Sequence, residues 1–179
     1  MENLSVFAVP FGFKEIFPNL RELEVFNSGL VFVSKPSIAG LENLIFHENN
    51  IKKLSSDTFW DCPDLKNLNL NNNQIPELDS SLFIYSPNLE VFQAAYNKIG
   101  ALDRDLFYEH KNLIEINLNG NRIKFVGVDF LRFKSIGFVD LRSNECFNAA
   151  INMKTANQII KLEFLQEIAI NCSSTTICL

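Results

Sequence analysis

The sequence predicts an α/β repeat fold, in which short strands stack into one parallel sheet and a helix closes the C-terminal end. Three observations predict it. Apolar residues recur with a period of about 24 residues, an asparagine stands at a fixed place in five of the six periods, and a phenylalanine precedes four of them at a fixed distance. A period of this length is typical of solenoids, in which each repeat is one structural unit that stacks on its neighbours.

The period is clearest in the middle of the chain. Three consecutive copies have the same spacing of apolar residues and asparagine: Leu65, Leu68, Leu70, Asn73, Ile75; then Leu89, Phe92, Ala94, Asn97, Ile99; then Leu113, Ile116, Leu118, Asn121, Ile123. An earlier copy begins at Leu41, a later one at Ile136, and a looser first copy at Leu20. This spacing is that of leucine-rich repeats. The fold class is therefore a leucine-rich-repeat solenoid (horseshoe) with a parallel concave sheet, here of six repeats.

Each position of the pattern has a physical role. The alternation in Leu68-Asn69-Leu70 is the period of two that marks a strand with one buried face. An asparagine pointing inward can donate to and accept from backbone groups left by the turn after each strand, so we expect a ladder of Asn49, Asn73, Asn97, Asn121 and Asn144. The aromatic residues ahead of each repeat, Phe59, Phe83, Phe107 and Phe130, are predicted to fill the convex side.

The ends of the period define three segments. Residues 1–19 read as a partial N-terminal repeat, residues 20–147 as the six repeats, and residues 148–179 as a C-terminal cap. Within the cap, Thr155 to Gln158 resembles a capping box that opens a helix. We expect this helix to cover the last repeat with an apolar stripe: Ile159, Leu162, Leu165 and Ala169.

Composition and charge narrow the function classes. The chain has 16 basic and 21 acidic residues, and the basic residues form no run, so neither nucleic acid nor an anionic membrane is a predicted partner. The apolar stretch Val6 to Phe13 is too short to span a bilayer. No secretory signal follows Met1. Either the protein is intracellular, or its amino terminus lies upstream of this sequence.

The start and end of the repeat array resemble one branch of these proteins. Phe17-Pro18-Asn19-Leu20-Arg-Glu-Leu-Glu-Val25, and Leu141-Arg-Ser-Asn-Glu-Cys146 with a helix and Cys172, are similar to the secreted leucine-rich-repeat proteins of dipteran insects, including the leucine-rich immune proteins. The resemblance covers nearly the whole chain. It implies an extracellular protein, with a capping disulfide, that recognises other proteins or microbial surfaces in innate immunity or signalling. No coiled-coil heptads follow the cap.

Cysteines and sequons give further expectations. Cys146 and Cys172 flank the predicted helix, so a bond between them would attach it to the solenoid; two buried thiols are the alternative. A bond between Cys62 and Cys178 is not expected, because they lie several coils apart. Two N-glycosylation sequons begin at Asn3 and Asn171.

No motif for chemistry was found. The sequence holds no signature of a hydrolase, metalloprotease, kinase or dinucleotide enzyme, so we predict a non-enzymatic protein with no catalytic residue and no cofactor. No metal site is expected, since there is no Cys-x-x-Cys pair and His47 and His110 fall at different phases of the repeat.

The concave face is the candidate binding surface. Its residues are the strand positions that flank the buried leucines, and the candidates are rich in amides: Glu22, Glu24, Phe26, His47, Asn69, Asn71, Gln93, Asn117, Asn119, Asp140 and Arg142. Amides donate and accept hydrogen bonds, which suits a protein or glycan partner. The edges or the convex side are the alternative surface. Two function classes stay open: an extracellular (secreted) recognition module, and a cytoplasmic adaptor that holds a protein complex together.

Overall fold

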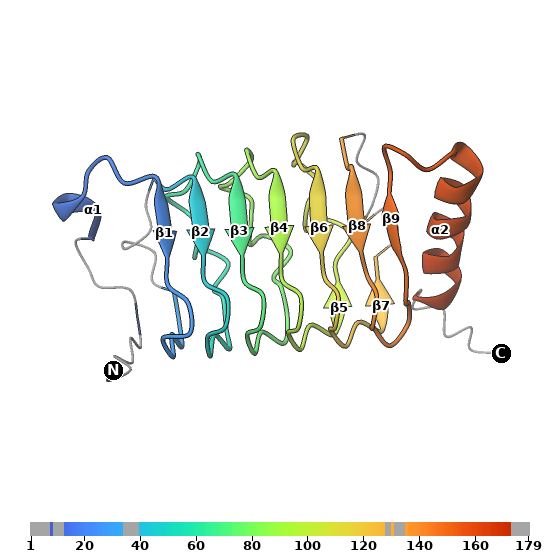
Figure 1. The fold of residues 1–179 in the computed structure, drawn as a ribbon, viewed down its shortest axis with the longest axis horizontal. Coiled ribbons are helices and arrows are strands. Elements are labelled where there is room, and N and C mark those ends of the chain that lie inside the picture. Colours follow the sequence, from blue (N-terminus) through green and yellow to red (C-terminus); the bar gives the residue numbers. More distant parts are fainter. Residues whose placement is uncertain (1–7, 9–12, 34–39, 128–129, 131–134, 173–179) are drawn as a thin grey trace.

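A computed structural model describes residues 8, 13–33, 40–127, 130 and 135–172. Over these residues the chain is a stack of coils, each of which contributes one short strand to the same sheet (Figure 1). Six strands run parallel and follow one another in chain order: β1 (Glu22–Glu24), β2 (Asn43–Ile45), β3 (Asn67–Asn69), β4 (Val91–Gln93), β6 (Glu115–Asn117) and β8 (Phe138–Asp140). The predicted solenoid of six parallel strands is confirmed.

Four elements go beyond the repeat pattern. β9 (Ala150–Asn152) pairs with β8 in the antiparallel direction and ends the sheet. β5 (Ala101–Leu102) and β7 (Phe125–Val126) form a separate parallel pair where their coils turn back from the sheet. At the other end, the one-turn helix α1 (Phe13–Ile16) precedes β1, and Ala8 forms a parallel bridge with Phe32. Most of the segment 1–12 lies outside the described residues.

The strands are short because only their middle residue faces the core. The middle side chains Leu44, Leu68, Phe92, Ile116 and Val139 are fully buried, whereas their neighbours on either side are more exposed in most strands. The parallel register places equivalent positions of successive coils side by side, so the chemistry of each position forms a column across the sheet.

The asparagine ladder forms as predicted. The Oδ1 atom of Asn73 accepts from the Ile51 backbone N–H at 3.0 Å. Its Nδ2 atom donates to the Leu70 carbonyl of its own coil at 3.1 Å and to the Phe46 carbonyl of the preceding coil at 2.8 Å. Asn49, Asn97, Asn121 and Asn144 repeat this arrangement. Each side chain therefore joins two coils through otherwise unsatisfied backbone groups.

A left-handed backbone conformation precedes each ladder position, and the sequence pattern gave no indication of it. The residue at this point has a positive φ in every repeat: Asn27, Glu48, Asn72, Tyr96, Gly120 and Ser143. Only glycine adopts such angles without steric cost. The tight turn after each strand is thus imposed by the coil, and five of its six residues bear the strain.

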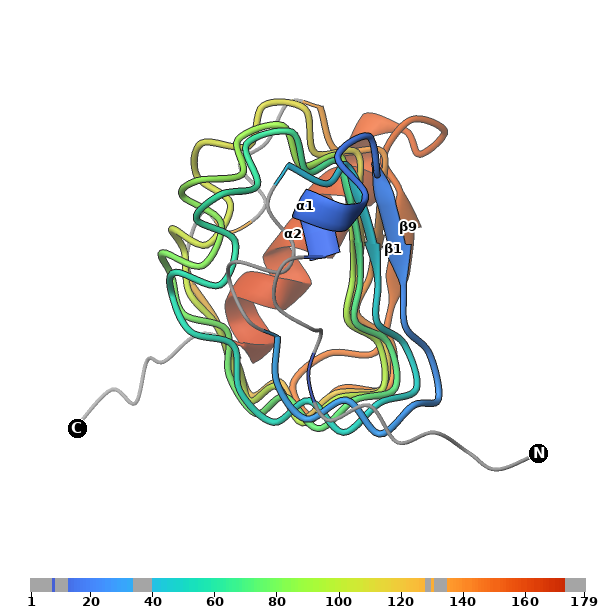
Figure 2. The same cartoon turned by 90° about the vertical axis from the view of Figure 1, so that its left-hand side faces the viewer.

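The phenylalanine spine fills the side opposite the sheet. Phe59, Phe83, Phe107 and Phe130 are buried, and successive ring centroids are 5.7, 5.4 and 5.8 Å apart. Figure 2 looks along the solenoid axis and shows the strands superposed on one side and the turns on the other. The predicted aromatic core is confirmed.

The helical cap is present but is oriented differently from the prediction. α2 (Gln158–Asn171) begins after Asn157, whose Oδ1 accepts from the Ile160 N–H at 2.9 Å, so Thr155 is not the capping residue. Its buried side chains are Phe164 and Ile168. The predicted core stripe, Ile159, Leu162, Leu165 and Ala169, is exposed instead. That prediction was wrong because the helix carries apolar residues on two sides.

Candidate binding surface

The concave face predicted from the sequence is the outer face of the seven-stranded sheet. The strand register aligns two columns of side chains on this face: Glu22, Asn43, Asn67, Val91, Glu115 and Phe138; and Glu24, Ile45, Asn69, Gln93, Asn117 and Asp140. A third column continues beyond the strand ends as Phe26, His47, Asn71, Ala95, Asn119 and Arg142. The structure therefore brings the candidate residues onto adjacent coils. Whether they bind a partner stays a prediction.

The asparagines of this face are held by the backbone through their oxygen atoms. Asn69 Oδ1 accepts from the Asn71 N–H at 3.0 Å, and Asn71 Oδ1 accepts from the Ala95 N–H of the next coil at 2.7 Å. Asn117 Oδ1 accepts from the Asn119 N–H at 3.1 Å. Among the described residues no acceptor faces the amide nitrogens of Asn69, Asn71 and Asn117. The middle of the concave face consequently offers oriented hydrogen-bond donors.

Two neighbours complete this central region. The Gln93 Nε2 donates to Glu115 Oε1 at 2.8 Å, which orients both side chains across adjacent coils. The Asn67 Nδ2 likewise donates to Asn43 Oδ1. Amides that already have one fixed bond lose less conformational entropy when a partner binds. The surface is therefore pre-organised.

Asp140 differs from its prediction as a solvent-facing contact, because its side chain is buried. The residue is only 2% exposed, and Arg142 covers it through Nε to Oδ1 at 3.0 Å and a second nitrogen to Oδ2 at 2.6 Å. Burial by itself would raise the pKa of this carboxyl, but the hydrogen bonds and charge of Arg142 keep the pKa below its ordinary value. Arg142 is thus the group that Asp140 orients and presents to solvent.

The N-terminal edge of the concave face is aromatic. The Phe26 ring stacks on the His47 imidazole with centroids 5.3 Å apart and planes 7° from parallel. Phe26 is exposed, and within the described part of the chain His47 Nδ1 has no hydrogen-bond partner. This pair adds an apolar platform beside the amide rows, while the His47 Nδ1 atom itself is buried.

Tyr96 is a surface residue that the sequence pattern missed. Its side chain is 58% exposed at the left-handed turn after β4, and its ring lies over Gly120 of the next coil. A Cβ on Gly120 would approach the Tyr96 ring to 2.6 Å, so the glycine makes room for the tyrosine. The sequence does carry a signal for this contact, because Gly120 stands one period of 24 residues after Tyr96.

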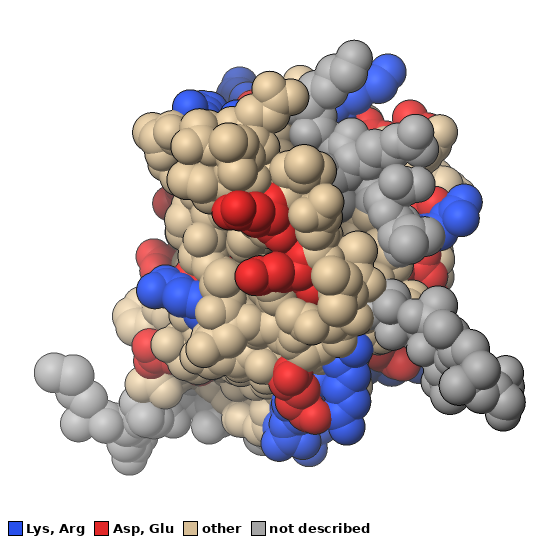
Figure 3. All heavy atoms as spheres, turned by 90° about the vertical axis from the view of Figure 1, so that its right-hand side faces the viewer, with Lys and Arg blue, Asp and Glu red and all other residues tan. Residues whose placement is uncertain are grey.

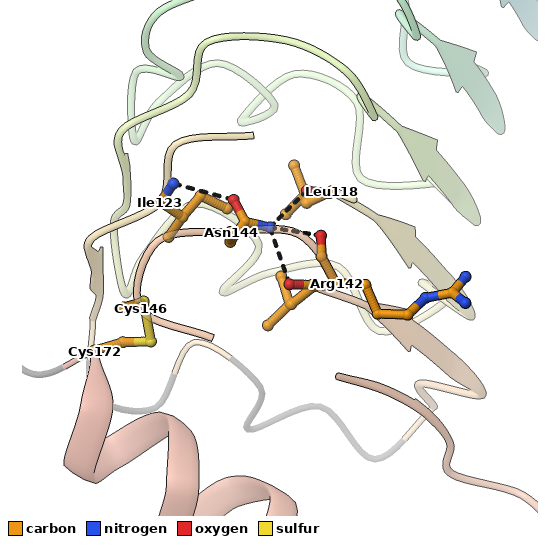
Figure 4. The surroundings of a disulfide bond; sticks show 7 residues. Leu118, Ile123, Arg142, Asn144, Cys146 and Cys172 are labelled. Carbon is orange, nitrogen blue, oxygen red and sulfur yellow. Dashed lines mark hydrogen bonds between the residues drawn. A yellow bond between two sulfur atoms is a disulfide. The ribbon is translucent and has the colours of Figure 1, made fainter. Parts of the chain in front are cut away.

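Cys146 and Cys172 are joined by a disulfide, with Cα atoms 5.1 Å apart (Figure 4). Cys146 follows Asn144, the last member of the ladder, and Cys172 directly follows α2, so the bond attaches the cap helix to the last coil. Asn171, the last residue of α2, is exposed, although its sequon shares the bonded Cys172. Asn3 and Cys178 lie outside the described residues.

The remaining candidates for chemistry are buried. Cys62 is fully buried, and burial, helped by Asp61, raises the pKa of its thiol to about 12, which keeps the sulfur protonated. His110 packs edge-on against both the Phe83 and Phe107 rings, with Nε2 3.2 Å from the Phe83 carbonyl, and burial lowers its pKa. No group of three metal-ligating side chains occurs within the described ranges. Nor does any helix there have the length and apolarity to cross a bilayer.

Comparisons with known proteins agree with the fold. A family model described as leucine rich repeat matches residues 18–75. Together with the stacked parallel strands and the asparagine ladder, this match defines the chain's fold as a leucine-rich-repeat domain. A search of curated protein sequences finds no match.

Two solved structures are similar in fold. The first is the LRIM1/APL1C complex, with a TM-score of 0.73 and 20% sequence identity over 79% of this chain and 27% of that chain. The second is the Toll–Spatzle complex, described as a molecular hub in Drosophila development and innate immunity, with a TM-score of 0.65 and 22% identity over 77% of this chain and 20% of that chain. This chain thus spans less than a third of either neighbour.

Proposed function

We propose that this chain is an extracellular, non-enzymatic recognition module whose concave face binds a protein or glycan partner, with a role in innate immunity or signalling. The observation that carries the proposal is the set of amide nitrogens on Asn69, Asn71 and Asn117. In each side chain a backbone N–H donates to the Oδ1 atom, which fixes the amide and leaves its nitrogen as a donor. Asn69 and Asn71 lie on one coil and Asn117 two coils further along, and amide nitrogens without an internal acceptor at these positions do not stabilise the core.

The partner's chemistry follows from this donor excess. A surface of oriented N–H groups is complemented by acceptors, which a peptide backbone supplies as carbonyls and a glycan as hydroxyl oxygens. Arg142 at one end of the face would pair with a carboxylate, and the Phe26–His47 platform at the other end would stack on an apolar or sugar ring. The acidic Glu22 and Glu24 disfavour a strongly acidic partner at the N-terminal edge.

The extracellular assignment rests on the disulfide. A bond between Cys146 and Cys172 persists in oxidising compartments and is rare in the cytosol. A protein of similar fold occurs in a complex described as a hub in development and innate immunity, which supports the same setting. Mass measurement of the purified native protein before and after reduction would test it. Two unbonded thiols in native material would favour the cytoplasmic adaptor.

The concave face is best tested with isosteric changes. Asn69→Asp, Asn71→Asp and Asn117→Asp keep the oxygen that accepts the backbone bond and replace each outward donor with an acceptor. We expect this triple variant to lose capture of its partner from extracellular fluid of the source organism while its unfolding midpoint barely moves. The matched control carries the same three added charges at solvent-exposed positions elsewhere: Asn50→Asp, Asn88→Asp and Asn148→Asp. Equal capture by both variants would place the site off the concave face.

A further inference from the structure

Helix α2 presents a second apolar side to solvent. Phe164 and Ile168 face the core, whereas Ile159, Leu162 and Ile170 are 67%, 55% and 76% exposed. Leu165 is exposed beside them. Positions 159, 162 and 170 fall on the side of an α-helix opposite 164 and 168, because residues three, four, seven and eleven apart share a face. We name Ile159, Leu162, Leu165 and Ile170 the outer face of α2.

The helix that carries this face is fixed at both ends. Asn157 caps its first turn, and the Phe164 ring packs edge-on against Phe147 with centroids 5.1 Å apart. At its C-terminal end, Cys172 is bonded to Cys146, and its carbonyl accepts from the Val126 N–H at 2.9 Å. The outer face therefore has a constant shape and needs no ordering before a partner packs on it.

Two carboxylates on α2 indicate the charge of a partner that would pack on the outer face. Glu163 and Glu167 are exposed on α2, one helical turn apart, and no ion pair joins either of them to another described residue. Figure 3 shows acidic side chains on the mainly uncharged middle of this end of the molecule, with basic and further acidic side chains towards its rim. Like charges spaced by four residues repel each other along a helix, and a cationic partner would relieve that repulsion.

We propose that the outer face of α2 docks an amphipathic helix of another protein, whose apolar side is flanked by lysine or arginine. Side chains spaced by three and four residues on α2 match the ridges and grooves of a second helix. A second copy of this chain is disfavoured, because it brings the same two carboxylates and a net charge of −5. An anionic membrane surface is disfavoured for the same reason.

A synthetic helical peptide with a leucine face and lysine on the remaining positions would serve as the probe. Its binding to the disulfide-bonded chain is followed by fluorescence anisotropy at physiological ionic strength, beside a leucine/glutamate peptide and a scrambled leucine/lysine peptide. We expect only the ordered leucine/lysine helix to bind. Ile159→Gln with Leu162→Gln should weaken it about tenfold or more, and Glu163→Gln with Glu167→Gln should weaken it and reduce its salt dependence.

Two controls keep the result specific. Ile84→Gln removes an equally exposed apolar side chain from the convex turns and should leave binding unchanged. The concave triple variant should also bind the peptide normally, so failure of the concave proposal stays distinguishable from failure of this one. All substituted residues are exposed, and circular dichroism would verify that each variant folds.

Five outcomes would overturn the proposal. The scrambled or acidic peptide could bind as well as the ordered basic helix, or the α2 variants could bind it as strongly as the wild type. Sedimentation could show a wild-type dimer that Ile159→Gln with Leu162→Gln dissociates, which would make a second copy the occupant. Retention of the chain by anionic vesicles would assign the face to lipid. A rise in peptide affinity on truncation after Cys172 would assign the face to the chain's own residues 173–179.

Discussion

Replacing Asn97 with leucine tests the asparagine ladder at its centre. The side chain is buried and makes four hydrogen bonds: Oδ1 accepts from the Ile75 N–H at 3.0 Å, and Nδ2 donates to the carbonyls of Leu70, Ala94 and Ala95 at 2.9, 3.2 and 3.3 Å. Leucine has the same branching and the same number of side-chain heavy atoms, with bulkier methyl groups, so it fills the space without these bonds. The cost is thus one of unsatisfied polar groups rather than of a cavity.

The structure shows which of these groups loses its partner. Each carbonyl keeps a second donor, namely Asn73 Nδ2 at Leu70, Asn121 Nδ2 at Ala94 and the Asn72 N–H at Ala95. The Ile75 N–H has Asn97 Oδ1 as its acceptor, and no other acceptor is found among the described residues. One buried N–H left unsatisfied costs about 1–3 kcal/mol, so we expect the free energy of unfolding to fall by that amount.

Urea unfolding followed by far-ultraviolet circular dichroism measures this loss, provided that the m-value stays constant. The matched control is Asn50→Leu, which removes an exposed asparagine that accepts a surface bond from Gln74 at 3.0 Å. This control should change stability by less than about 0.5 kcal/mol. An Asn97→Leu midpoint equal to that of the control would refute the assignment of the ladder as a stabilising element.

Three further predictions concern stability. Gly120→Ala should cost about 1–2 kcal/mol, because it places a Cβ at φ +69° and 2.6 Å from the Tyr96 ring; thermal unfolding would show it, and Tyr96→Ala in the same chain should recover part of the loss. Cys146→Ser with Cys172→Ser should cost about 3–4 kcal/mol in urea unfolding, since the bond closes a loop of 26 residues. Burial lowers the folded-state pKa of His110 below 6.5, so the unfolded chain takes up a proton first; stability should decline as pH falls from about 6.5 towards the folded-state pKa, and an equal slope in His110→Gln would count against this.

The repeat itself was predictable from the sequence because its physics is local and recurs. Leu68 and Asn73 have the same task in their coil as Phe92 and Asn97 have in the next, so each copy supports the interpretation of the others. The columns of the concave face follow from the same register. The burial of Asp140 did not, because it depends on Arg142 folding back over the carboxylate.

The cap was less predictable because it occurs once. α2 carries apolar residues on two sides, and periodicity alone does not decide which side meets the core. The side that meets the core is indicated by Cys172. Phe164, Ile168 and Cys172 are spaced by four residues and share one side of the helix, and the disulfide directs that side towards the last coil. β9 has only three residues and lies outside the repeat pattern, so the sequence did not predict it. Its antiparallel direction depends on the return of the chain after Asn144.

The reversal at β9 determines how this array can be lengthened. Every junction from β1 to β8 is of one kind, with parallel strands, a shared ladder asparagine and, in the middle coils, stacked phenylalanines, so a duplicated 24-residue unit could be spliced there without new chemistry. After β9 no such junction exists, because the strand runs the other way and α2 covers the core beyond it. Design or duplication that extends this protein must therefore insert coils inside the stack, before β9.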